Sequence, residues 1–319
     1  MAKPDQKSIG VIGARGHTGQ ELLSLLLAHP RFSIVFAGSR KLAGKPLSAL
    51  ADGLGENLKF EDISPADLRD RQFDALVLAL PNGMAAEYVA AVDEARPQSV
   101  VLDLSADYRF DKSWYYGLPE LTRRHASGKT RIANPGCYAT AMQLALAPVA
   151  DVLAAPACCF GVSGYSGAGT SPSERNDPDV LANNLLAYQP AGHIHEREVS
   201  HHLAGPVRFM PHVAAFFRGI HMTSALTLTT PHTVDELSAR YEAHYHGEPL
   251  VKLSRDIPRV ADNANRHHAA VGGWAVSDDG RQAVVYSTLD NLLKGAATQA
   301  LQNLNNAFGF AESEGIPHG

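Results

Sequence analysis

The sequence predicts an α/β fold in two parts, with a parallel sheet flanked by helices in the first half and a mixed sheet backed by helices in the second. Strand-like and helix-like segments alternate in the first half, and a glycine-rich turn follows the first strand. In the second half the strands come in runs. A chain of 319 residues is also long enough to form two domains.

Composition and charge favour a small-molecule substrate. The chain has 28 basic and 33 acidic residues, a formal net charge of −5, and no long run of either sign. We therefore expect neither a nucleic-acid partner nor a membrane partner. Residues 1–7 are polar and lead directly into a strand, and no apolar run is long enough to span a bilayer, so a cytoplasmic protein is expected.

The glycine-rich turn is typical of a Rossmann-type dinucleotide site. A strand at 8–12 is followed by three glycines in the spacing G-x-x-G-x-x-G and then by a helix at 20–28. Such a turn lets the backbone approach a pyrophosphate closely, and the helix start favours an anion. The expected cofactor contacts are Gly13, Arg15, Gly16, His17, Thr18 and Gly19.

The end of the second strand, 32–37, indicates which cofactor binds. A free ribose 2′-hydroxyl usually meets a carboxylate here, whereas a 2′-phosphate requires a cation and hydroxyl donors. This chain has Ser39, Arg40 and Lys41 and no acid, which predicts NADP(H), although a basic surface loop would look the same.

Further strands at 73–80 and 99–104, separated by a helix at 85–95, extend the parallel sheet. Open α/β sheets bind ligands at the carboxyl ends of their strands, so Pro81 and Ser105 are expected at the cofactor. Arg109 follows Ser105 closely and is a candidate for binding phosphate or carboxylate, or alternatively a structural ion-pair partner.

Cys137 stands at a break between a short strand at 131–133 and an Ala/Leu-rich helix. Unpaired amides and the helix dipole at a helix start bias a thiol toward the nucleophilic thiolate. The alternative is a small buried hydrophobe. Cys158 and Cys159 lie in an apolar run, where we expect burial, and the three cysteines have no disulfide or zinc-ribbon spacing.

The second half contains strands at 157–162, 207–217 and 222–229, a helix at 234–245, and a hairpin of 269–277 with 282–288. The small residues between 163 and 172 form either a mobile linker or a loop close to a ligand. A last helix, 292–308, is amphipathic and needs an apolar surface to cover.

Two histidines one residue apart, His193 and His195, precede Glu196 and Glu198. The segment is not HExxH, so we expect no metal site. A general acid or base that pairs with a thiolate and a pair of surface histidines both fit the pattern.

Several separated stretches together resemble the N-acetyl-gamma-glutamyl-phosphate reductase family of the aspartate-semialdehyde dehydrogenase superfamily. They span nearly the whole chain and comprise residues 13–19, 102–109, 116–121, Asn134-Pro135-Gly136-Cys137-Tyr138-Ala139-Thr140-Ala141, 166–169, Pro211-His212, Arg218-Gly219 and 290–297.

The resemblance implies that Cys137 is the nucleophile, that His195 is its acid/base partner, and that the C-terminal helix packs on the cofactor domain. The expected domains are residues 1–148 with 290–319 for NADP binding, and 149–289 for catalysis and oligomerisation. The remaining candidate substrate contacts are Asn134, which could help to stabilise an oxyanion, His193, Glu198 and Arg218; as for Arg109, the alternative for Arg218 is a structural ion-pair partner. The remaining cofactor contacts are Gly167 and Asn291.

The implied reaction is the NADPH-dependent reduction of N-acetyl-glutamyl 5-phosphate to the 5-semialdehyde, a step of arginine biosynthesis, through a thioester on Cys137. Three positions depart from the family pattern. Ile194 stands where Arg is usual, Arg197 replaces a proline, and Thr170 replaces an arginine after Ser-Gly-Ala-Gly. These changes leave open how the substrate carboxylate or acyl group is held.

Two rival functions remain. One is a related reductase of aspartyl phosphate or of a carrier-linked aminoadipyl phosphate. The other is an NADP-binding redox sensor that oxidises Cys137 without turnover. We also expect a homo-oligomer, either a dimer or a tetramer.

Overall fold

The computed structural model describes residues 6–50, 54, 57–203 and 205–317. The chain forms two compact units, Met1–Pro135 with Ala296–His318, and Gly136–Gly295. The division thus falls 13 residues before the expected boundary at 148/149, because the helix that begins at Cys137 packs on the second sheet. Residues 1–5 of the polar N-terminal segment and residues 318–319 lie outside the described residues.

The first unit is built on a seven-stranded sheet in which every neighbouring pair is parallel, as predicted. The order is β3-β2-β1-β4-β5-β7-β6, so the direction of winding reverses between β1 and β4, where open α/β sheets bind ligands. The strands are β1 (Lys7–Ile12), β2 (Phe32–Gly38), β3 (Phe60–Glu61), β4 (Ala75–Leu78), β5 (Val100–Asp103), β6 (Tyr115–Tyr116) and β7 (Arg131–Ala133).

The C-terminal helix belongs to this first unit, as the resemblance implied. Helix α9 (Thr298–Ala307) contacts α1 (His17–Ala28) and β5, and its Leu301 and Leu304 are fully buried. A π-helical turn, Leu293–Ala297, precedes it. The other helices of the unit are α2 (Ala86–Ala95) and α3 (Pro119–Thr122).

The second unit contains a mixed seven-stranded sheet, again as predicted. Its order is β12-β13-β14-β11-β8-β10-β9; the pairs β8/β10 and β12/β13 are parallel, and the others are antiparallel. The strands are β8 (Ala157–Gly164), β9 (Leu185–Ala187), β10 (Val207–Ala214), β11 (Ile220–Thr227), β12 (Val251–Ser254), β13 (Ala269–Val276) and β14 (Gln282–Leu289).

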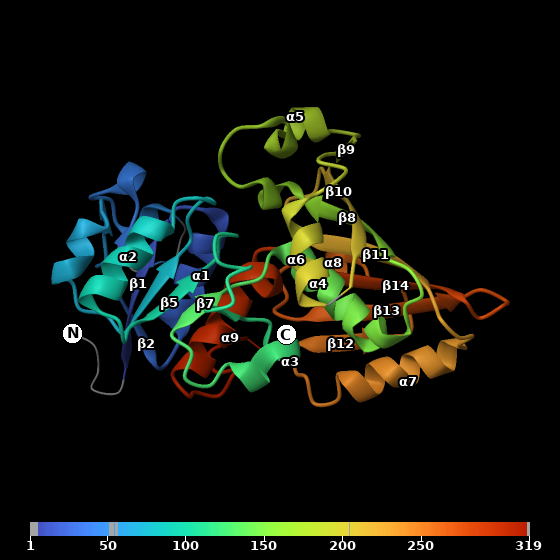
Figure 1. The fold of residues 1–319 in the computed structure, drawn as a ribbon. Helices are drawn as coiled ribbons and strands as arrows, with labels where there is room; N and C mark the ends of the chain where they lie inside the picture. The colour runs from blue at the N-terminus through green and yellow to red at the C-terminus, as the bar shows by residue number, and fades with distance from the viewer. Residues whose placement is uncertain (1–5, 51–53, 55–56, 204, 318–319) are drawn as a thin grey trace. The chain divides into compact units, whose positions relative to one another are not determined.

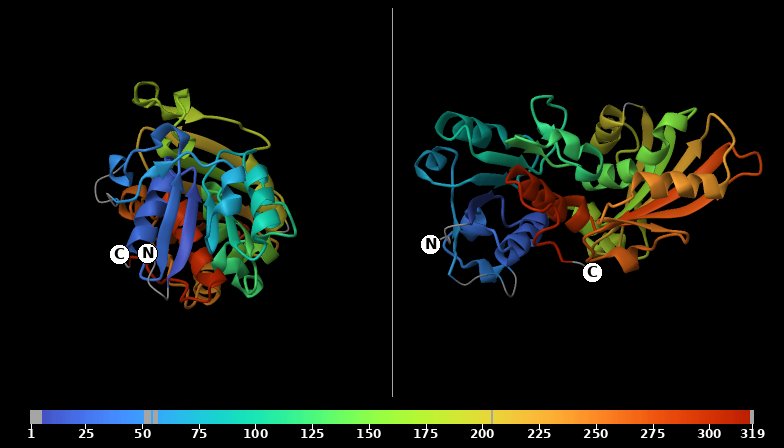
Figure 2. Two further views of the ribbon diagram at one scale, coloured as in Figure 1. Left: turned by 90° about the vertical axis from the view of Figure 1, so that its left-hand side faces the viewer. Right: turned by 90° about the horizontal axis from the view of Figure 1, so that it is seen from below.

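Helices α4 (Cys137–Leu146), α6 (Ile194–His202) and α7 (Val234–His244) pack on this sheet: α4 on β11, β13 and β14, α6 on β10, and α7 on β13 (Figures 1 and 2). The Tyr241 hydroxyl donates to the Ala145 carbonyl, which fixes α7 beside α4. Two short helices, α5 (Pro178–Leu181) and α8 (Val260–Asn263), lie in connecting segments. No helix among the described residues is both long and apolar enough to cross a bilayer.

Exposure alternates along the central strands of the second sheet. In β8, Ala157 and Cys159 are buried on the face that carries α4, whereas Cys158 is exposed and Phe160 is half-buried on the other face. The expected burial of Cys158 is therefore wrong, because successive side chains of a strand point to opposite faces. One face of the sheet thus remains largely without helices.

Candidate functional site

The glycine turn after β1 has the geometry of a dinucleotide cradle. Gly13 has φ +82°, and a Cβ there would lie 2.2 Å from the Ala79 carbonyl oxygen. The amides of Gly13 and Ala14 both donate to the Gly38 carbonyl at the end of β2. Gly16 has no neighbour nearer than 3.8 Å to a Cβ, and no side chain caps the start of α1. The turn therefore leaves room for a phosphate group at the helix start.

The residues after β2 lie beside this turn. Ser39 is buried and its amide donates to the Glu61 carbonyl, whereas the Arg40 side chain is exposed and lies 3.7 Å from the Asp62 carboxylate. An exposed ion pair of this length contributes little to stability. The Arg40 guanidinium therefore remains available to a ligand.

The segments after β4 and β5 are joined by hydrogen bonds, from the Ala106 amide to the Asn82 side chain and from the Gly83 amide to the Asp107 carboxylate. Pro81 is exposed after β4, while Ser105 is buried and its hydroxyl donates to the Asp103 carboxylate at 2.6 Å. Burial raises the pKa of Asp103. The Ser105 hydroxyl is thus engaged within the protein, where it also accepts the Asp107 amide.

Arg109 and Asn134 come together in the first unit, but Arg109 points inward. It is buried, and its guanidinium donates to the carbonyls of Asn134 and Leu104, both at 2.9 Å. Asn134 is itself fully buried and accepts a bond from the Asn303 side chain at 3.1 Å. This geometry favours a structural role for Arg109.

Cys137 is the first residue of α4, as the break in the sequence pattern predicted, and it is half-buried. The Gly136 amide at this helix start donates to the buried carboxylate of Glu198 on α6, at 2.9 Å. Gly295 passes so close that a Cβ there would lie 2.7 Å from the Cys137 Cβ. Position 295, next to Cys137, therefore has no room for a residue larger than glycine.

The two histidines lie in this cluster with different environments. His193 is buried, and its Nδ1 accepts the amide of His195 at 3.2 Å, which caps the N-terminus of α6. Burial, and next the positive charge of Arg175, lower the pKa of His193 to about 4. The ring of His195 lies 5.9 Å from the Tyr138 ring, on the first turn of α6.

Two tyrosines that the sequence did not single out complete the cluster. The Tyr138 ring lies against both imidazoles and against Phe209, and its hydroxyl donates to the His212 carbonyl at 2.6 Å. Tyr188 follows β9 and lies 5.7 Å from the His193 ring. Burial, and next the neighbouring Cys137, raise the pKa of Tyr188 to about 12. The only sequence signal for these residues was their place beside Cys137 and at the end of an apolar run.

The remaining candidates in the second unit form a separate hydrogen-bonded group. Arg218 pairs with the fully buried Asp290 at 3.1 Å, which favours a structural ion-pair role. The Asn291 side chain accepts the Gly219 amide and donates to the Ser166 hydroxyl, so it ties two loops together. A Cβ on Gly167 would lie 2.9 Å from the Ser163 hydroxyl oxygen.

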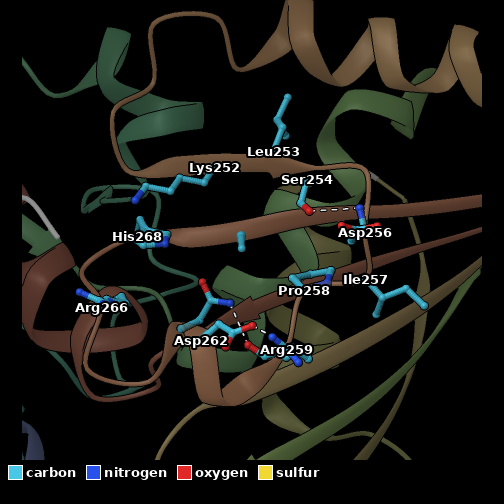
Figure 3. Close-up of a pocket in the computed structure, with 12 residues that line it drawn as sticks. Lys252, Leu253, Ser254, Asp256, Ile257, Pro258, Arg259, Asp262, Arg266 and His268 are labelled. Atoms are coloured by element: carbon cyan, nitrogen blue, oxygen red, sulfur yellow. Dashed lines mark hydrogen bonds and ion pairs between the residues drawn. The ribbon is translucent and has the colours of Figure 1, made fainter.

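A pocket of about 690 Å3 opens at the opposite edge of the second sheet, along β12 and β13 (Figure 3). Its charged lining comes from Lys252, Asp256, Arg259, Asp262 and Arg266, and His268 lies beside them. Burial and the cations Lys252 and Arg266 lower the pKa of His268 to about 4. None of the site residues expected from the sequence lines this pocket.

The cluster of Cys137, His195 and Glu198 therefore has the composition of a nucleophilic site. A thiol at a helix start, an imidazole on the neighbouring helix and a fixed carboxylate suit covalent catalysis on an acyl group. The glycine turn of the first unit is a different kind of site, with the composition of a nucleotide-binding turn.

Two family models match the chain, one in its first half and one in its second half. The semialdehyde dehydrogenase NAD binding domain matches residues 8–129, and the semialdehyde dehydrogenase dimerisation domain matches residues 137–291. The second match begins at Cys137, the first residue of α4.

Similar proteins match over nearly their full lengths. An N-acetyl-gamma-glutamyl-phosphate reductase of Xanthomonas euvesicatoria is 53% identical over 308 residues, 97% of this chain and 98% of that protein. One of Xylella fastidiosa is 50% identical over 98% of this chain and 95% of its own.

Solved structures support the fold at low identity. Aspartate semialdehyde dehydrogenase II of Vibrio cholerae superposes with a TM-score of 0.79 at 17% identity, covering 95% of this chain and 98% of that one. The Candida albicans enzyme with NADP superposes with a TM-score of 0.73 at 16% identity, covering 95% and 98%.

Proposed function

The chain belongs to the N-acetyl-gamma-glutamyl-phosphate reductase family, and from that premise we propose that it reduces N-acetyl-glutamyl 5-phosphate to N-acetyl-glutamate 5-semialdehyde. The observation that carries this proposal is the cluster around Cys137. The thiol starts α4, and α6 brings His195 and Glu198 to it through the bond from the Gly136 amide to Glu198.

Covalent catalysis divides a difficult reduction into two steps. The Cys137 thiolate attacks the acyl carbon, a C–S bond forms, and the C–O bond to phosphate breaks, which gives a thioester and inorganic phosphate. A nicotinamide cofactor held at the glycine turn would supply the hydride that reduces this thioester. The resulting thiohemiacetal collapses to the aldehyde, and Cys137 leaves as the thiolate.

His195 is the residue proposed to move the proton in this cycle. An imidazole titrates close to neutral pH and can either take the thiol proton or protonate the developing oxyanion. Glu198 stabilises the start of α4 through the Gly136 amide, and so acts on the position of Cys137. Amides at the start of α4 are suited to stabilise the oxyanion.

The cofactor is a nicotinamide dinucleotide, since residues 8–129 match an NAD binding domain and the glycine turn has room for phosphate. We propose that NADP(H) is preferred. The support is the exposed Arg40 and the adjacent Lys41 after β2, with the Ser39 hydroxyl nearby, where a 2′-phosphate would lie.

We further propose a homo-oligomer, dimer or tetramer, formed through the face of the second sheet that carries no helix. Residues 137–291 match a dimerisation domain, and this face presents half-buried Phe160, Val162, Val284 and Tyr286. A continuous apolar sheet face of this kind is typical of a protein interface.

The reverse reaction provides the test. With N-acetylglutamate semialdehyde and phosphate, we expect NADP+ to be reduced much faster than NAD+, and no turnover when phosphate is omitted. Cys137→Ser should abolish turnover, because a hydroxyl is far less nucleophilic, while NADPH still binds.

Three outcomes would contradict the proposal. Faster turnover of aspartate semialdehyde would identify the related reductase, and binding of NADPH without any turnover would identify a redox sensor. Near-normal turnover of the Cys137→Ser variant would remove Cys137 from the mechanism.

A further inference from the structure

Arg175 is a cation beside the Cys137 cluster to which the mechanism assigns no role. It lies in a 3-10 turn, Glu174–Asn176, in the segment between β8 and β9, and its side chain is exposed. Its guanidinium carbon lies 4.9 Å from the centroid of the Tyr188 ring. No carboxylate among the described residues pairs with it.

The turn that carries Arg175 is held by local hydrogen bonds. The Ser173 side chain and the Asn176 side chain form a capping box around the turn. The Asn176 side chain also donates to the carbonyls of Gly169 and Ser171, at 2.9 and 2.8 Å. These hydrogen bonds fix the loop that carries Arg175, and the guanidinium lies over the Tyr188 ring.

Arg175 and Cys137 are both neighbours of Tyr188. Arg175 also acts on His193, where its positive charge adds to burial in lowering the pKa of that imidazole. The positive charge of Arg175, opposed at His193 by the charge of Glu196, thus lies on the outer side of the cluster. Such a site attracts an anionic group of a ligand.

The other candidate arginines are already engaged. Arg109 donates to two backbone carbonyls, and Arg218 pairs with the buried Asp290. A guanidinium that lies on an aromatic ring keeps its edge N–H groups free, and these match the two oxygens of a carboxylate. Arg175 has this arrangement.

We propose that Arg175 binds the α-carboxylate of the acyl-glutamate substrate and so selects substrates that carry it. This inference rests on the proposed function. The phosphate must leave from the carbon that Cys137 attacks. The Arg175 guanidinium lies instead over the Tyr188 ring, which borders the cluster on the side of His193. The anion it binds is therefore at the far end of the substrate.

The test compares two aldehydes in the reverse reaction, N-acetylglutamate semialdehyde and 4-acetamidobutanal, which is the same molecule without the carboxylate. For Arg175→Gln we expect KM for the first aldehyde to rise about 10- to 100-fold with little change in kcat, as for the loss of a charge-assisted hydrogen-bond pair. The kinetics of the second aldehyde should not change. For Arg175→Lys we expect a KM for N-acetylglutamate semialdehyde between those of the unaltered enzyme and Arg175→Gln. Lysine keeps the positive charge but lacks the paired N–H donors of the guanidinium.

Arg255→Gln, which removes an exposed arginine after β12, is the matched control and should leave both aldehydes unaffected. An equal loss with both aldehydes in Arg175→Gln would mean that Arg175 only supports Tyr188, and would overturn the inference while the function stands. If the unaltered enzyme turned over neither aldehyde, the proposed function itself would fail, and the inference with it.

Discussion

At the scale of single residues, the two neighbouring histidines have different chemistry. His193 is buried and uses Nδ1 to accept a backbone amide, so its role as the N-cap of α6 requires the neutral ring. Its pKa of about 4 keeps it neutral at neutral pH. His195 lies two residues further, within the helix and facing Tyr138. An offset of two residues therefore separates a capping residue from the candidate acid/base.

Substitution of each histidine by asparagine separates these roles. His195→Asn should slow turnover by roughly a hundredfold or more, because the proton-transfer group is lost. His193→Asn should change turnover only slightly, since an asparagine side chain also caps a helix well. Steady-state kinetics of both variants provide the measurement. The reverse order of effects would show that His193 is the catalytic imidazole.

At the scale of secondary-structure elements, the strand-to-helix turns position the chemistry. The turn after β1 requires Gly13 because its φ is +82° and the Ala79 backbone lies against it. Gly16 is different, since nothing in the protein fills the space beside it. The start of α4 is fixed in another way, by the Glu198 carboxylate on the Gly136 amide. The start of α1 is thus fixed by backbone constraint, and the start of α4 is fixed by a hydrogen bond to a side chain.

The difference between Gly13 and Gly16 can be measured. Gly13→Ala should lower the free energy of unfolding by about 2 kcal/mol or more, from strain at positive φ together with the clash. Gly16→Ala should unfold like the unaltered protein but bind NADPH more weakly, because its Cβ would enter the phosphate space. Thermal unfolding and cofactor titration test the pair. Unchanged NADPH affinity in Gly16→Ala would show that the cofactor does not approach this residue.

At the scale of the whole molecule, each unit combines a complete sheet with its own helices, and the buried histidines are distributed over both. Burial is the main cause of the lowered pKa values of His29 in the first unit and of His193 and His268 in the second; the half-buried His221 also has a lowered pKa. A folded state that resists protonation loses stability in acid, because the unfolded chain takes up those protons more readily.

Stability should therefore depend on pH in a defined window. Above pH 6.5 neither state protonates these rings; as the pH falls from 6.5 toward 4, His193 and His268 should each remove on the order of 1–3 kcal/mol from the free energy of unfolding. Urea unfolding at pH 7, 5.5 and 4.5 provides the measurement. His193→Asn and His268→Gln should each flatten the dependence, and an unchanged slope in both variants would contradict this origin.

Much of the fold could be predicted because it depends on local pattern. The parallel sheet followed from alternating strands and helices, and the start of α4 at Cys137 followed from the Asn-Pro-Gly break. What the pattern could not decide concerns contacts between distant residues. The expected burial of Cys158 is wrong because one sheet face is largely without helices. The sequence left two roles open for Arg109, and it gave no direct signal for the bond from its guanidinium to the Asn134 carbonyl.

The sequence by itself determined the two-part α/β architecture, the glycine turn and the position of the cysteine at a helix start, since backbone sterics and hydrophobic periodicity act over a few residues. Only the tertiary structure decided which polar groups meet. Packing of α6 on α4 brings Glu198 to the Gly136 amide, and the loop before β9 brings Arg175 to Tyr188. Hydrogen bonds and charge interactions act over a few ångströms, so they depend on where the folded chain places residues that are far apart in sequence.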